Sequence, residues 1–412
     1  MNAQGMVIVG AGEAGARAAL TLRSLGWTGA ITLVGDESRP PYERPPLSKR
    51  HLVAEEELPP SVIADDRTLR DSGIERIGGE AAVRIDRENH LVELAGGRKL
   101  PYERLLLATG ARPRQLSAEG TGAGELLYLR RFEDAERLRG RLRPRARAVI
   151  IGGGFIGLET AASAAARGCA VTLLEAAPRL LTRGVPQAIA ERVERLHRQA
   201  GVEVRLGAAV AAIDRAGDAL AIRLADGTEL AADVALAGIG AVPETALAAS
   251  CGLELDNGVK ADARLATSDP DIYAAGDCCS FPHPLYGGRR IRLEAWRNAK
   301  DQGAHAAAAM LGSDEPYAVL PWFWSDQYDQ TLLVAGLAEP SDTVVLRDLG
   351  EAGRLYFHLG ADGRLSAVSG MGPSEAIAKP FRQAELLAEK RAAPPAEQLA
   401  DPRIKLKTWL SE

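Results

Sequence analysis

Two glycine-rich stretches contain the residues whose spacing predicts chemistry most directly. In the first, Gly10, Gly12 and Gly15 follow the apolar run 6–9 in the order G-x-G-x-x-G. In this pattern one glycine makes a tight turn, one admits a close phosphate, and one lets a helix pack against a strand. Free amide groups at the start of the following helix can then bind a pyrophosphate. The stretch therefore predicts a site for a dinucleotide.

The same pattern recurs in the middle of the chain. Gly152, Gly154 and Gly157 follow the apolar run 148–151. A helix is expected after each glycine turn, over 16–25 and 158–167, and a second strand after each helix, over 30–34 and 170–174. Because strand, turn, helix and strand occur in this order twice, chance is a poor explanation, and two Rossmann-like units are predicted. The alternative is a duplicated domain in which one site binds nothing.

An acidic residue ends the second copy. Glu175 directly follows strand 170–174, in the position that contacts a ribose 2′-hydroxyl. A carboxylate there repels the 2′-phosphate of NADP(H), so NAD(H) is favoured. Arg179 and Arg183 lie close by in sequence and favour the phosphate instead. We give the carboxylate more weight and expect NADH.

The first copy ends differently. Gly35 occupies the position directly after strand 30–34, and Asp36 and Glu37 follow it. Asp36 is therefore the better candidate for a ribose contact, with Glu37 second. The two sites are expected to hold different dinucleotides, one resident and one visiting.

Three further strand ends are rich in glycine and small residues. One ends at Thr109 and Gly110, and another ends at Gly276 and Asp277. Each would bring small residues toward a nucleotide, although a buried strand followed by a turn has the same composition, and Asp277 could be a helix N-cap. The stretches are YERLLLATGARPR (102–114), ADVALAGIGAVPET (232–245) and SDPDIYAAGDCCS (268–280).

Length and composition limit the class of protein. The 412 residues are 46% hydrophobic and 25% charged, with a formal net charge of −5, which predicts an ordinary globular chain of two to three domains. The acidic balance argues against nucleic-acid binding. We find no signal peptide and no apolar stretch long enough to span a bilayer, and we expect a cytoplasmic protein without membrane contact.

The cysteines and histidines predict no metal site. Cys169, Cys251, Cys278 and Cys279 form no C-x-x-C pair, and the histidines form no H-E-x-x-H motif. Cys278 and Cys279 are adjacent, where a disulfide needs a strained ring, so we interpret them as small buried residues.

Longer stretches resemble a known family. The chain resembles the NADH-dependent ferredoxin reductases of the glutathione reductase-like superfamily, of the putidaredoxin reductase and biphenyl dioxygenase reductase type. The resemblance covers nearly the whole chain and implies an α/β fold with two Rossmann-like dinucleotide-binding domains, for FAD and NAD, and a C-terminal α+β interface domain. Its most specific stretches are RPPYERPPLSK (39–49), LRRFEDA (129–135), IYAAGDC (272–278), RLEAWRNAKDQG (292–303) and WFWSDQYD (322–329).

Domain boundaries follow from the order of these patterns. The FAD-binding domain is expected to be discontinuous, over 1–112 and 242–320, with the NADH-binding domain at 113–241. From Pro321 the pattern changes to short alternating β runs, which predict the separate domain 321–412. Its helix is expected to be interrupted or started by Pro380.

The resemblance also implies a set of FAD-binding residues. Lys49 would lie near the reactive N5 edge of the flavin, Asp36 at the adenosine ribose, and the backbone of Ala82 near the adenine. The set consists of Gly10, Gly12, Ala14, Gly15, Asp36, Glu37, Arg44, Lys49, Ala82, Thr109, Gly110, Arg130, Gly276, Asp277, Ala295 and Trp296.

Lys49 follows four prolines in the ten residues 39–48, a composition that excludes a helix and predicts a stiff extended loop. A cation held there could stabilise an anionic reduced flavin, whereas the alternative is a solvated surface lysine.

For NADH the resemblance implies a second set. Glu159 would face the nicotinamide and pair with Lys49, and these two are the catalytic candidates. The alternative for Glu159 is an exposed helix residue. The set consists of Gly152, Gly154, Phe155, Ile156, Gly157, Glu159, Glu175, Arg183, Gly238 and Gly240.

The route of the electrons follows from a missing residue type. Disulfide-reducing relatives carry redox cysteines near the first helix or the adjoining loop, and the segment PPLSKRHLV (45–53) has none. Electrons would then leave singly to an external [2Fe-2S] ferredoxin, which would serve a Rieske oxygenase or a cytochrome P450. Trp322 and Trp324 would border this exit, or simply form an aromatic core.

An acidic carrier needs a basic docking patch, and Arg289, Arg290, Arg292 and Arg297 are candidates, although a solvated arginine face is as good an interpretation. The expected enzyme is an FAD-dependent ferredoxin–NAD(+) reductase, active as a monomer or weak homodimer. The alternatives are an NADH oxidase, a rubredoxin reductase-like or nitrite reductase-related flavoprotein, or a signalling flavoprotein resembling apoptosis-inducing factor.

Overall fold

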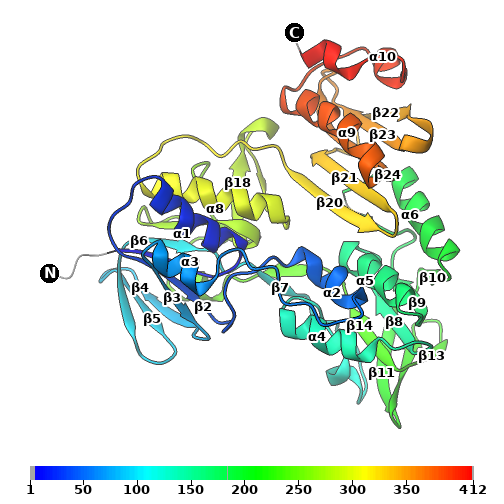
Figure 1. Cartoon of the computed structure of the whole chain (residues 1–412), viewed down its shortest axis with the longest axis horizontal. Helices are drawn as coiled ribbons and strands as arrows, with labels where there is room; N and C mark the ends of the chain where they lie inside the picture. The colour runs from blue at the N-terminus through cyan, green and yellow to red at the C-terminus, as the bar shows by residue number, and fades with distance from the viewer. Residues whose placement is uncertain (1–4, 183, 411–412) are drawn as a thin grey trace. The chain divides into compact units, whose positions relative to one another are not determined.

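The structure is a computed structural model that describes residues 5–182 and 184–410. These residues form two compact units (Figure 1). Of the described residues, the first contains 5–44, 59–112 and 241–319, and the second contains 45–58, 113–182, 184–240 and 320–410. Residues 45–58, which the sequence analysis placed with the FAD-binding segments, therefore pack within the second unit.

A parallel sheet forms the centre of the first unit. Its strands run in the order β3-β2-β1-β6-β17, and every neighbouring pair is parallel. Val7, Ile8 and their neighbours on β6 are almost fully buried, because a parallel sheet is covered on both faces. The strands are β1 (Gly5–Val9), β2 (Ile31–Gly35), β3 (Ile74–Gly78), β6 (Lys99–Leu107) and β17 (Ile272–Ala274).

Two helices cover this sheet in close contact. Helix α1 (Glu13–Ser24) lies beside α8 (Trp296–Met310), the blue and yellow helices at the left of Figure 1. A Cβ atom at Gly303 would lie 2.2 Å from the carbonyl oxygen of Ala14, so only glycine permits this approach. Ala16, Ala18 and Leu22 on α1 are fully buried, which explains the small residues of this helix.

The remaining elements of the first unit are short. Strands β4 and β5 extend from β6 as an antiparallel meander. The elements are α3 (Asp66–Asp71), β4 (Ala82–Asp86), β5 (Leu91–Leu94), β7 (Ala111–Pro113), β15 (Ala241–Pro243), α7 (Ala246–Ser250), β16 (Val259–Lys260), the 3-10 turns Gly276–Cys278 and Pro284–Tyr286, β18 (Cys279–His283) and β19 (Arg289–Ile291).

The second unit repeats the architecture of the first. Its parallel sheet has the order β10-β9-β8-β14, which corresponds to β3-β2-β1-β6, and an antiparallel meander, β11-β12-β13, lies between β10 and β14 in the sequence. The strands are β8 (Arg147–Ile151), β9 (Ala170–Glu175), β10 (Glu203–Leu206), β11 (Val210–Ala216), β12 (Ala219–Leu224), β13 (Glu229–Ala232) and β14 (Val234–Ala237), with helices α4 (Phe132–Arg141), α5 (Phe155–Ala166) and α6 (Gln187–Gln199) and the 3-10 turn Ala123–Glu125.

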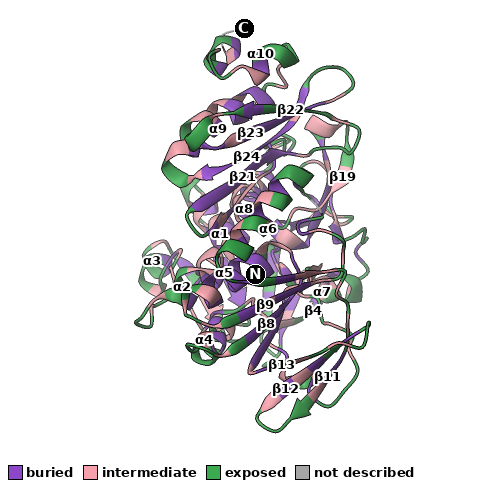
Figure 2. Ribbon diagram, turned by 90° about the vertical axis from the view of Figure 1, so that its right-hand side faces the viewer, coloured by how far each residue is buried: buried purple, intermediate pink, exposed green. Residues whose placement is uncertain are grey.

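The C-terminal part is an antiparallel sheet with one long helix. Its strand order is β20-β21-β24-β23-β22, and Figure 2 shows buried residues along β21, β23 and β24. Helix α9 (Ser374–Glu389) continues through Pro380, so the proline neither starts nor interrupts it. The strands are β20 (Trp322–Gln327), β21 (Gln330–Gly336), β22 (Thr343–Asp348), β23 (Arg354–Leu359) and β24 (Leu365–Pro373), with a 3-10 turn at Gly350–Ala352 between β22 and β23, and α10 (Ala396–Ala400) and the 3-10 turn Leu406–Leu410 near the C-terminus.

Two local expectations are corrected. The proline-rich loop is not extended up to Lys49, because Pro45–Ser48 forms a 3-10 turn and α2 (Arg50–Val53) follows. Pro45 and Pro46 occupy the first positions of that turn, where no amide donor is required. Asp277 is not an N-cap, because the 3-10 turn that contains it is capped by Ala275, and α8 begins after Ala295.

Candidate functional site

The first glycine turn has the shape of a phosphate cradle. Gly10 has φ +112°, and a Cβ atom there would lie 2.0 Å from the carbonyl oxygen of Ala108. A Cβ at Gly15 would lie 1.9 Å from the carbonyl oxygen of Gly10. Gly12 has no atom within 4 Å of its Cβ position, so the space above it is open. Gly12 also begins α1 without a side-chain cap, which leaves helix amides available to an anion.

The second turn has the same features. Gly152 has φ +108°, and its Cβ would lie 2.5 Å from the carbonyl oxygen of Gly238. At Gly157 the Cβ would lie 1.9 Å from the carbonyl oxygen of Gly152. The nearest atom to the Cβ position of Gly154 is 3.9 Å away, and no side chain caps α5. Both turns therefore fit a pyrophosphate.

One exchange of side chains distinguishes the two turns. Glu175 ends β9 and accepts hydrogen bonds from the amides of Gly153 and Ala177, each at 2.7 Å. In the first unit the equivalent strand-end residue is Gly35, whose Cβ would lie only 2.7 Å from the Cβ of Ala11. Since Ala11 occupies the position equivalent to Gly153, a methyl group there excludes a strand-end side chain. An acidic residue that contacts the ribose in the first unit must therefore come after the strand-end position.

Asp36 and Glu37 differ in their surroundings. Asp36 is exposed. Glu37 is mostly buried, and its carboxylate accepts a hydrogen bond from the Tyr42 hydroxyl at 2.5 Å and one from the Arg44 guanidinium at 2.6 Å. Glu37 is thus held in one orientation by two side chains, and the ribose contact of Asp36, with Glu37 second, stays a prediction. Arg44, a predicted cofactor residue, holds Glu37 in place and also faces Asp277.

The other predicted FAD residues of the first unit lie at strand and helix ends. The Thr109 hydroxyl donates to the carbonyl oxygen of Glu244 at 2.6 Å, and Gly110 follows with φ +71°. Gly276, with φ +80°, donates its amide to Gln302 at 2.8 Å. Ala14 lies on α1 and packs toward Gly276, Ala295 and Trp296 start α8, and Ala82 starts β4. Lys49 and Arg130 belong to the second unit.

Lys49 belongs to a partly buried charge cluster of the second unit. Its ammonium lies 3.4 Å from Glu159 Oε1 and 3.1 Å from Asp326 Oδ2. It also lies 5.0 Å from the centre of the Trp324 ring, within the range of a cation–π contact. The pair of Lys49 with Glu159 that the resemblance implied is therefore present, and Lys49 is not a solvated surface lysine.

Hydroxyl groups complete the surroundings of Glu159, which is only 6% exposed on the first turns of α5. Ser48 donates to its Oε2 atom at 2.5 Å, and Ser325 donates to its Oε1 atom at 2.6 Å. Burial raises the pKa of Glu159, while Lys49 and the two serines oppose that rise. The alternative of an exposed helix residue is thereby wrong.

Ser48, Ser325 and Asp326 were missed as site residues. Each adjoins a residue that the sequence analysis selected, because Ser48 precedes Lys49, and Ser325 and Asp326 follow Trp324. The stretch WFWSDQYD signalled the segment, but a contact between residues more than 100 positions apart has no local signal.

The remaining predicted NADH residues surround the second turn. Gly238 packs on it, with its Cβ position 3.1 Å from the amide nitrogen of Gly157, and Gly240 has φ +105°. Ile156 is 44% exposed at the start of α5, whereas the Phe155 ring packs edge-on against Phe323 at 5.0 Å. Arg183 lies outside the described residues.

The two tryptophans expected at the electron exit lie close together, whereas two of the arginines expected at a docking patch are bonded within the first unit. Trp322 and Trp324 are partly buried, with ring centres 5.6 Å apart. Arg290 donates to the carbonyl oxygens of Ala261 and Ser280, and the Arg292 side chain is 9% exposed and bonds to Asp277 and Glu294. These two arginines are therefore bonded within the first unit, and the docking patch stays a prediction.

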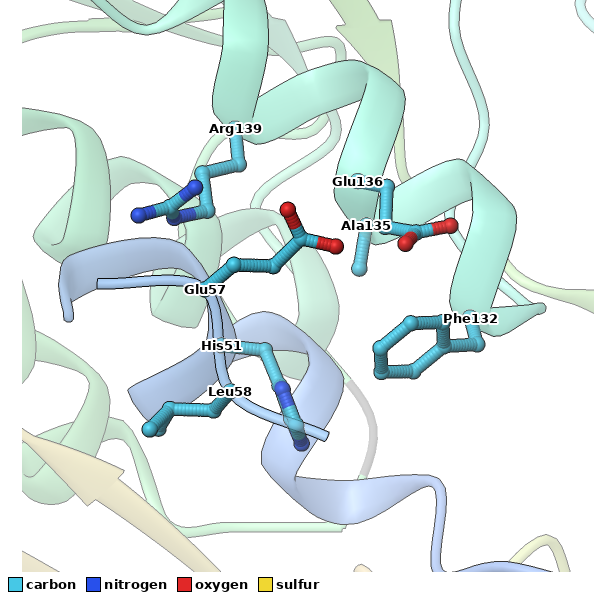
Figure 3. Close-up of a pocket in the computed structure, with 7 residues that line it drawn as sticks. All are labelled: His51, Glu57, Leu58, Phe132, Ala135, Glu136 and Arg139. Atoms are coloured by element: carbon cyan, nitrogen blue, oxygen red, sulfur yellow. The ribbon is translucent and has the colours of Figure 1, made fainter. Parts of the chain in front are cut away.

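A small pocket lies elsewhere in the second unit (Figure 3). His51 from α2 and Phe132 from α4 meet there edge-on at 5.3 Å. His51 Nε2 is buried without a hydrogen-bond partner among the described residues, and burial lowers the pKa of this histidine. The pocket contains no residue of either predicted nucleotide set. It is lined by His51, Glu57, Leu58, Phe132, Ala135, Glu136 and Arg139.

Among the described residues, no group of histidine, cysteine and carboxylate side chains could hold a metal ion, and none of the helices is long and apolar enough to cross a membrane. The four cysteines are unpaired. Cys278 and Cys279 are fully buried, and burial raises the pKa of both thiols.

Comparison with known proteins agrees with this geometry. Residues 5–303 match the family described as pyridine nucleotide-disulphide oxidoreductase, and residues 322–410 match the reductase C-terminal family. The chain belongs to the pyridine nucleotide-disulphide oxidoreductase family. The resemblance and the α/β fold class stated from sequence are confirmed, and the protein is an oxidoreductase.

Individual relatives match over the full length. The anthranilate 1,2-dioxygenase system ferredoxin--NAD(+) reductase component of Burkholderia cepacia is 39% identical and covers 100% of both chains. Putidaredoxin reductase CamA of Pseudomonas putida is 38% identical over 99% of this chain and 97% of its own. The structure of the covalent putidaredoxin reductase–putidaredoxin complex matches with a TM-score of 0.93 and 37% identity, over 100% of this chain and 99% of that one.

Proposed function

We propose that this protein is an FAD-containing ferredoxin–NAD(+) reductase. Hydride passes from NADH to FAD, and single electrons then pass to a [2Fe-2S] ferredoxin that serves a Rieske oxygenase or a cytochrome P450. The observation that carries the proposal is the pair of open glycine turns in a chain whose full-length relatives are named as reductases of this kind.

The described residues have definite tasks in this proposal. A bound flavin would supply acceptance of a hydride and release of electrons one at a time. The open space and free amides at Gly12 and Gly154 receive the two pyrophosphates. Glu175, held by two amides, keeps lone pairs for the ribose hydroxyls and repels a 2′-phosphate.

Lys49 provides a fixed cation in the same proposal. Glu159 and Asp326 hold its ammonium from two sides. An ammonium fixed in a partly buried site stabilises nearby negative charge more strongly than a solvated one does. The roles of Lys49 and Glu159 toward the cofactors, and those of the other predicted site residues, are part of this proposal.

The cysteines support one-electron transfer to an external carrier. Cys278 and Cys279 have raised thiol pKa values and no access to solvent, so neither offers a thiolate for disulfide exchange. The finer points of the proposal are the three domain boundaries, a monomer or weak homodimer and a cytoplasmic location.

An assay with a terminal acceptor tests the proposal. The enzyme is mixed with NADH and cytochrome c, with and without a [2Fe-2S] ferredoxin of an oxygenase system. We expect the reduction of cytochrome c to require the ferredoxin and to saturate with it, while oxygen consumption without the ferredoxin stays slow. Fast oxygen consumption that the ferredoxin does not alter would instead identify an NADH oxidase.

A further inference from the structure

A continuous chain of hydrogen bonds leads to Glu159 through the C-terminal sheet. Ser325 donates to Glu159 at 2.6 Å, and the Gln327 amide donates to the Ser325 hydroxyl at 2.9 Å. The Gln327 carbonyl oxygen lies 3.0 Å from His197 Nε2, and the Tyr328 hydroxyl lies 3.0 Å from His197 Nδ1. Five side chains from β20, the following turn, α5 and α6 are thus connected.

The chemistry of each group gives the chain one direction. The Gln327 carbonyl oxygen can only accept, so His197 Nε2 must carry a hydrogen and donate it. A neutral imidazole then accepts at Nδ1, which makes the Tyr328 hydroxyl the donor there. Because Ser325 accepts from Gln327, its own hydrogen is directed to Glu159.

The burial of the chain keeps this direction fixed. Ser325, Gln327 and His197 are all 0% exposed. Burial lowers the pKa of His197 to about 4, so the ring is neutral at physiological pH. Apart from Gln327 and Tyr328, no hydrogen-bonding or charged side chain is recorded against His197 among the described residues.

The strand geometry explains the arrangement of the motif. Ser325 and Gln327 are two positions apart on β20, so their side chains lie on the same face. Trp324 and Asp326 alternate with them, and Asp326 accepts from the Trp324 indole at 3.2 Å and contacts Lys49. The stretch WFWSDQYD therefore serves the Lys49–Glu159 pair from both faces of one strand.

We infer that His197 and Gln327 are positioning residues, which orient the Ser325 hydroxyl toward Glu159 and thereby keep this carboxylate ionised opposite Lys49. The inference deepens the proposed function, because it assigns the control of a catalytic candidate to two residues that belong to neither predicted nucleotide set. Only its meaning for catalysis, and not the hydrogen-bond chain itself, rests on that function.

The test reverses the direction of the hydrogen-bond chain at one side-chain atom of Gln327. In Q327E the new carboxylate can only accept, so it attracts the Ser325 hydrogen away from Glu159. A matched control exists at Gln330, which faces Gln327 across the β20–β21 pair, is buried, and accepts a hydrogen bond from Arg192 instead. Q330E introduces the same charge without touching the chain.

The readout is the ionisation of Glu159 itself. Infrared spectra of the holoenzyme are recorded over a pH series, and the C=O band of the protonated acid is assigned by its loss in E159Q. We expect Q327E to raise the midpoint of this band by about one to two pH units, which is the loss of one hydrogen bond to a charged group. Q330E should leave the midpoint where it is in the wild type.

A double-mutant cycle separates orientation from added charge. S325A should raise the midpoint of Glu159 by a similar amount, and Q327E should add little in the S325A background. Full additivity of the two shifts, or equal shifts in Q327E and Q330E, would overturn the inference. If Q327E does not fold, Q327M decides in its place, because it removes the amide that donates to Ser325 without adding a charge, and an unchanged midpoint in Q327M would overturn the inference.

The same samples distinguish failure of this inference from failure of the proposed function. Infrared titration requires neither NADH nor ferredoxin, so a shifted Glu159 in an enzyme that NADH does not reduce would refute the function alone. Normal reduction by NADH with an unshifted Glu159 in Q327E would refute the inference alone.

Discussion

At the residue scale, one methyl group separates the two glycine turns. Ala11 in the first turn closes the space that Gly153 leaves open in the second, and only the second turn receives a strand-end carboxylate. The G-x-G-x-x-G spacing is the same in both. The difference between the two sites therefore lies in residues that the spacing rule does not mention.

This geometry predicts the effect of G153A. A Cβ at this position would lie 2.5 Å from Leu180 Cδ2 and 3.0 Å from Glu175 Oε2, so the carboxylate must move. We expect NADH binding to weaken roughly 10- to 100-fold, the value of one hydrogen bond to a charged group. Titration of the holoenzyme with NADH, followed by fluorescence, measures the change.

The control for G153A is G140A. Gly140 lies on α4 in the same unit, has no atom within 4 Å of its Cβ position and does not have a positive φ. The affinity for NADH should be unchanged in G140A. Equal affinities in G153A and the wild type would mean that Glu175 does not hold the ribose.

Prediction from sequence at this scale depended on the type of signal. The functional glycines could be predicted because each has a steric task at a fixed spacing. The pair of Lys49 and Glu159 came from the resemblance, since 110 positions separate the two in the sequence. Ser48 and Ser325 have no such signal, because a serine beside a charged residue is common on any surface.

At the element scale, the buried His197 connects α6 to the C-terminal sheet. Burial lowers the pKa of His197 to about 4, from an ordinary value near 6.5. The unfolded chain binds a proton between these two values and the folded chain does not, so the free energy of unfolding must fall as the pH falls below about 6.5.

H197Q tests this dependence. Between pH 7 and pH 5 the wild type should lose about 2 kcal/mol of unfolding free energy that H197Q does not lose. Chemical denaturation of both proteins at the two pH values measures the difference. The other buried histidines titrate in both proteins and cancel, so parallel pH curves would contradict the assignment.

The tail after α10 is held by a buried arginine. Arg347 on β22 is 4% exposed and donates to the carbonyl oxygens of Leu399, Pro402 and Ile404. Residues 401–410 form an ordered strap in the structure, and Trp409 near the end of this strap is buried.

R347M should release this strap. We expect the unfolding free energy to fall by about 2 kcal/mol, because several buried carbonyl groups lose a charged donor. Trypsin should then cleave faster at Lys405 and Lys407. R354M on the neighbouring strand removes an exposed ion pair and should change neither quantity noticeably. Identical cleavage of R347M and the wild type would refute the role of Arg347.

Element types were predictable where periodicity and packing agreed. The strands and helices around both glycine turns lie within a few residues of their predicted positions, because their apolar patterns match burial on both faces. The prediction of an extended loop before Lys49 was wrong, since prolines exclude an α-helix but can occupy the first positions of a 3-10 turn. Pro380 was predicted to start or interrupt α9, but the surrounding packing keeps that helix continuous.

At the scale of the whole molecule, the two units share one strand order. In both sheets, β3-β2-β1-β6 and β10-β9-β8-β14, antiparallel strands come directly before the last strand in the sequence. In the sequence the repeat could be recognised only at the glycine turns. The antiparallel strands of the two units share their alternating pattern, but their residues are not similar. The membership of residues 45–58 in the second unit had no local signal, since it depends on contacts with α4 and α5.

The proposed reaction requires that NADH reduce the flavin and that the electrons continue to a ferredoxin. Anaerobic stopped-flow mixing of the yellow holoenzyme with NADH, and separately with NADPH, tests it most directly through the bleaching of the flavin band. We expect fast bleaching with NADH, much slower bleaching with NADPH because Glu175 repels the 2′-phosphate, and recovery of the band when oxidised [2Fe-2S] ferredoxin is added. Slow bleaching with both nucleotides would contradict it and favour a signalling flavoprotein.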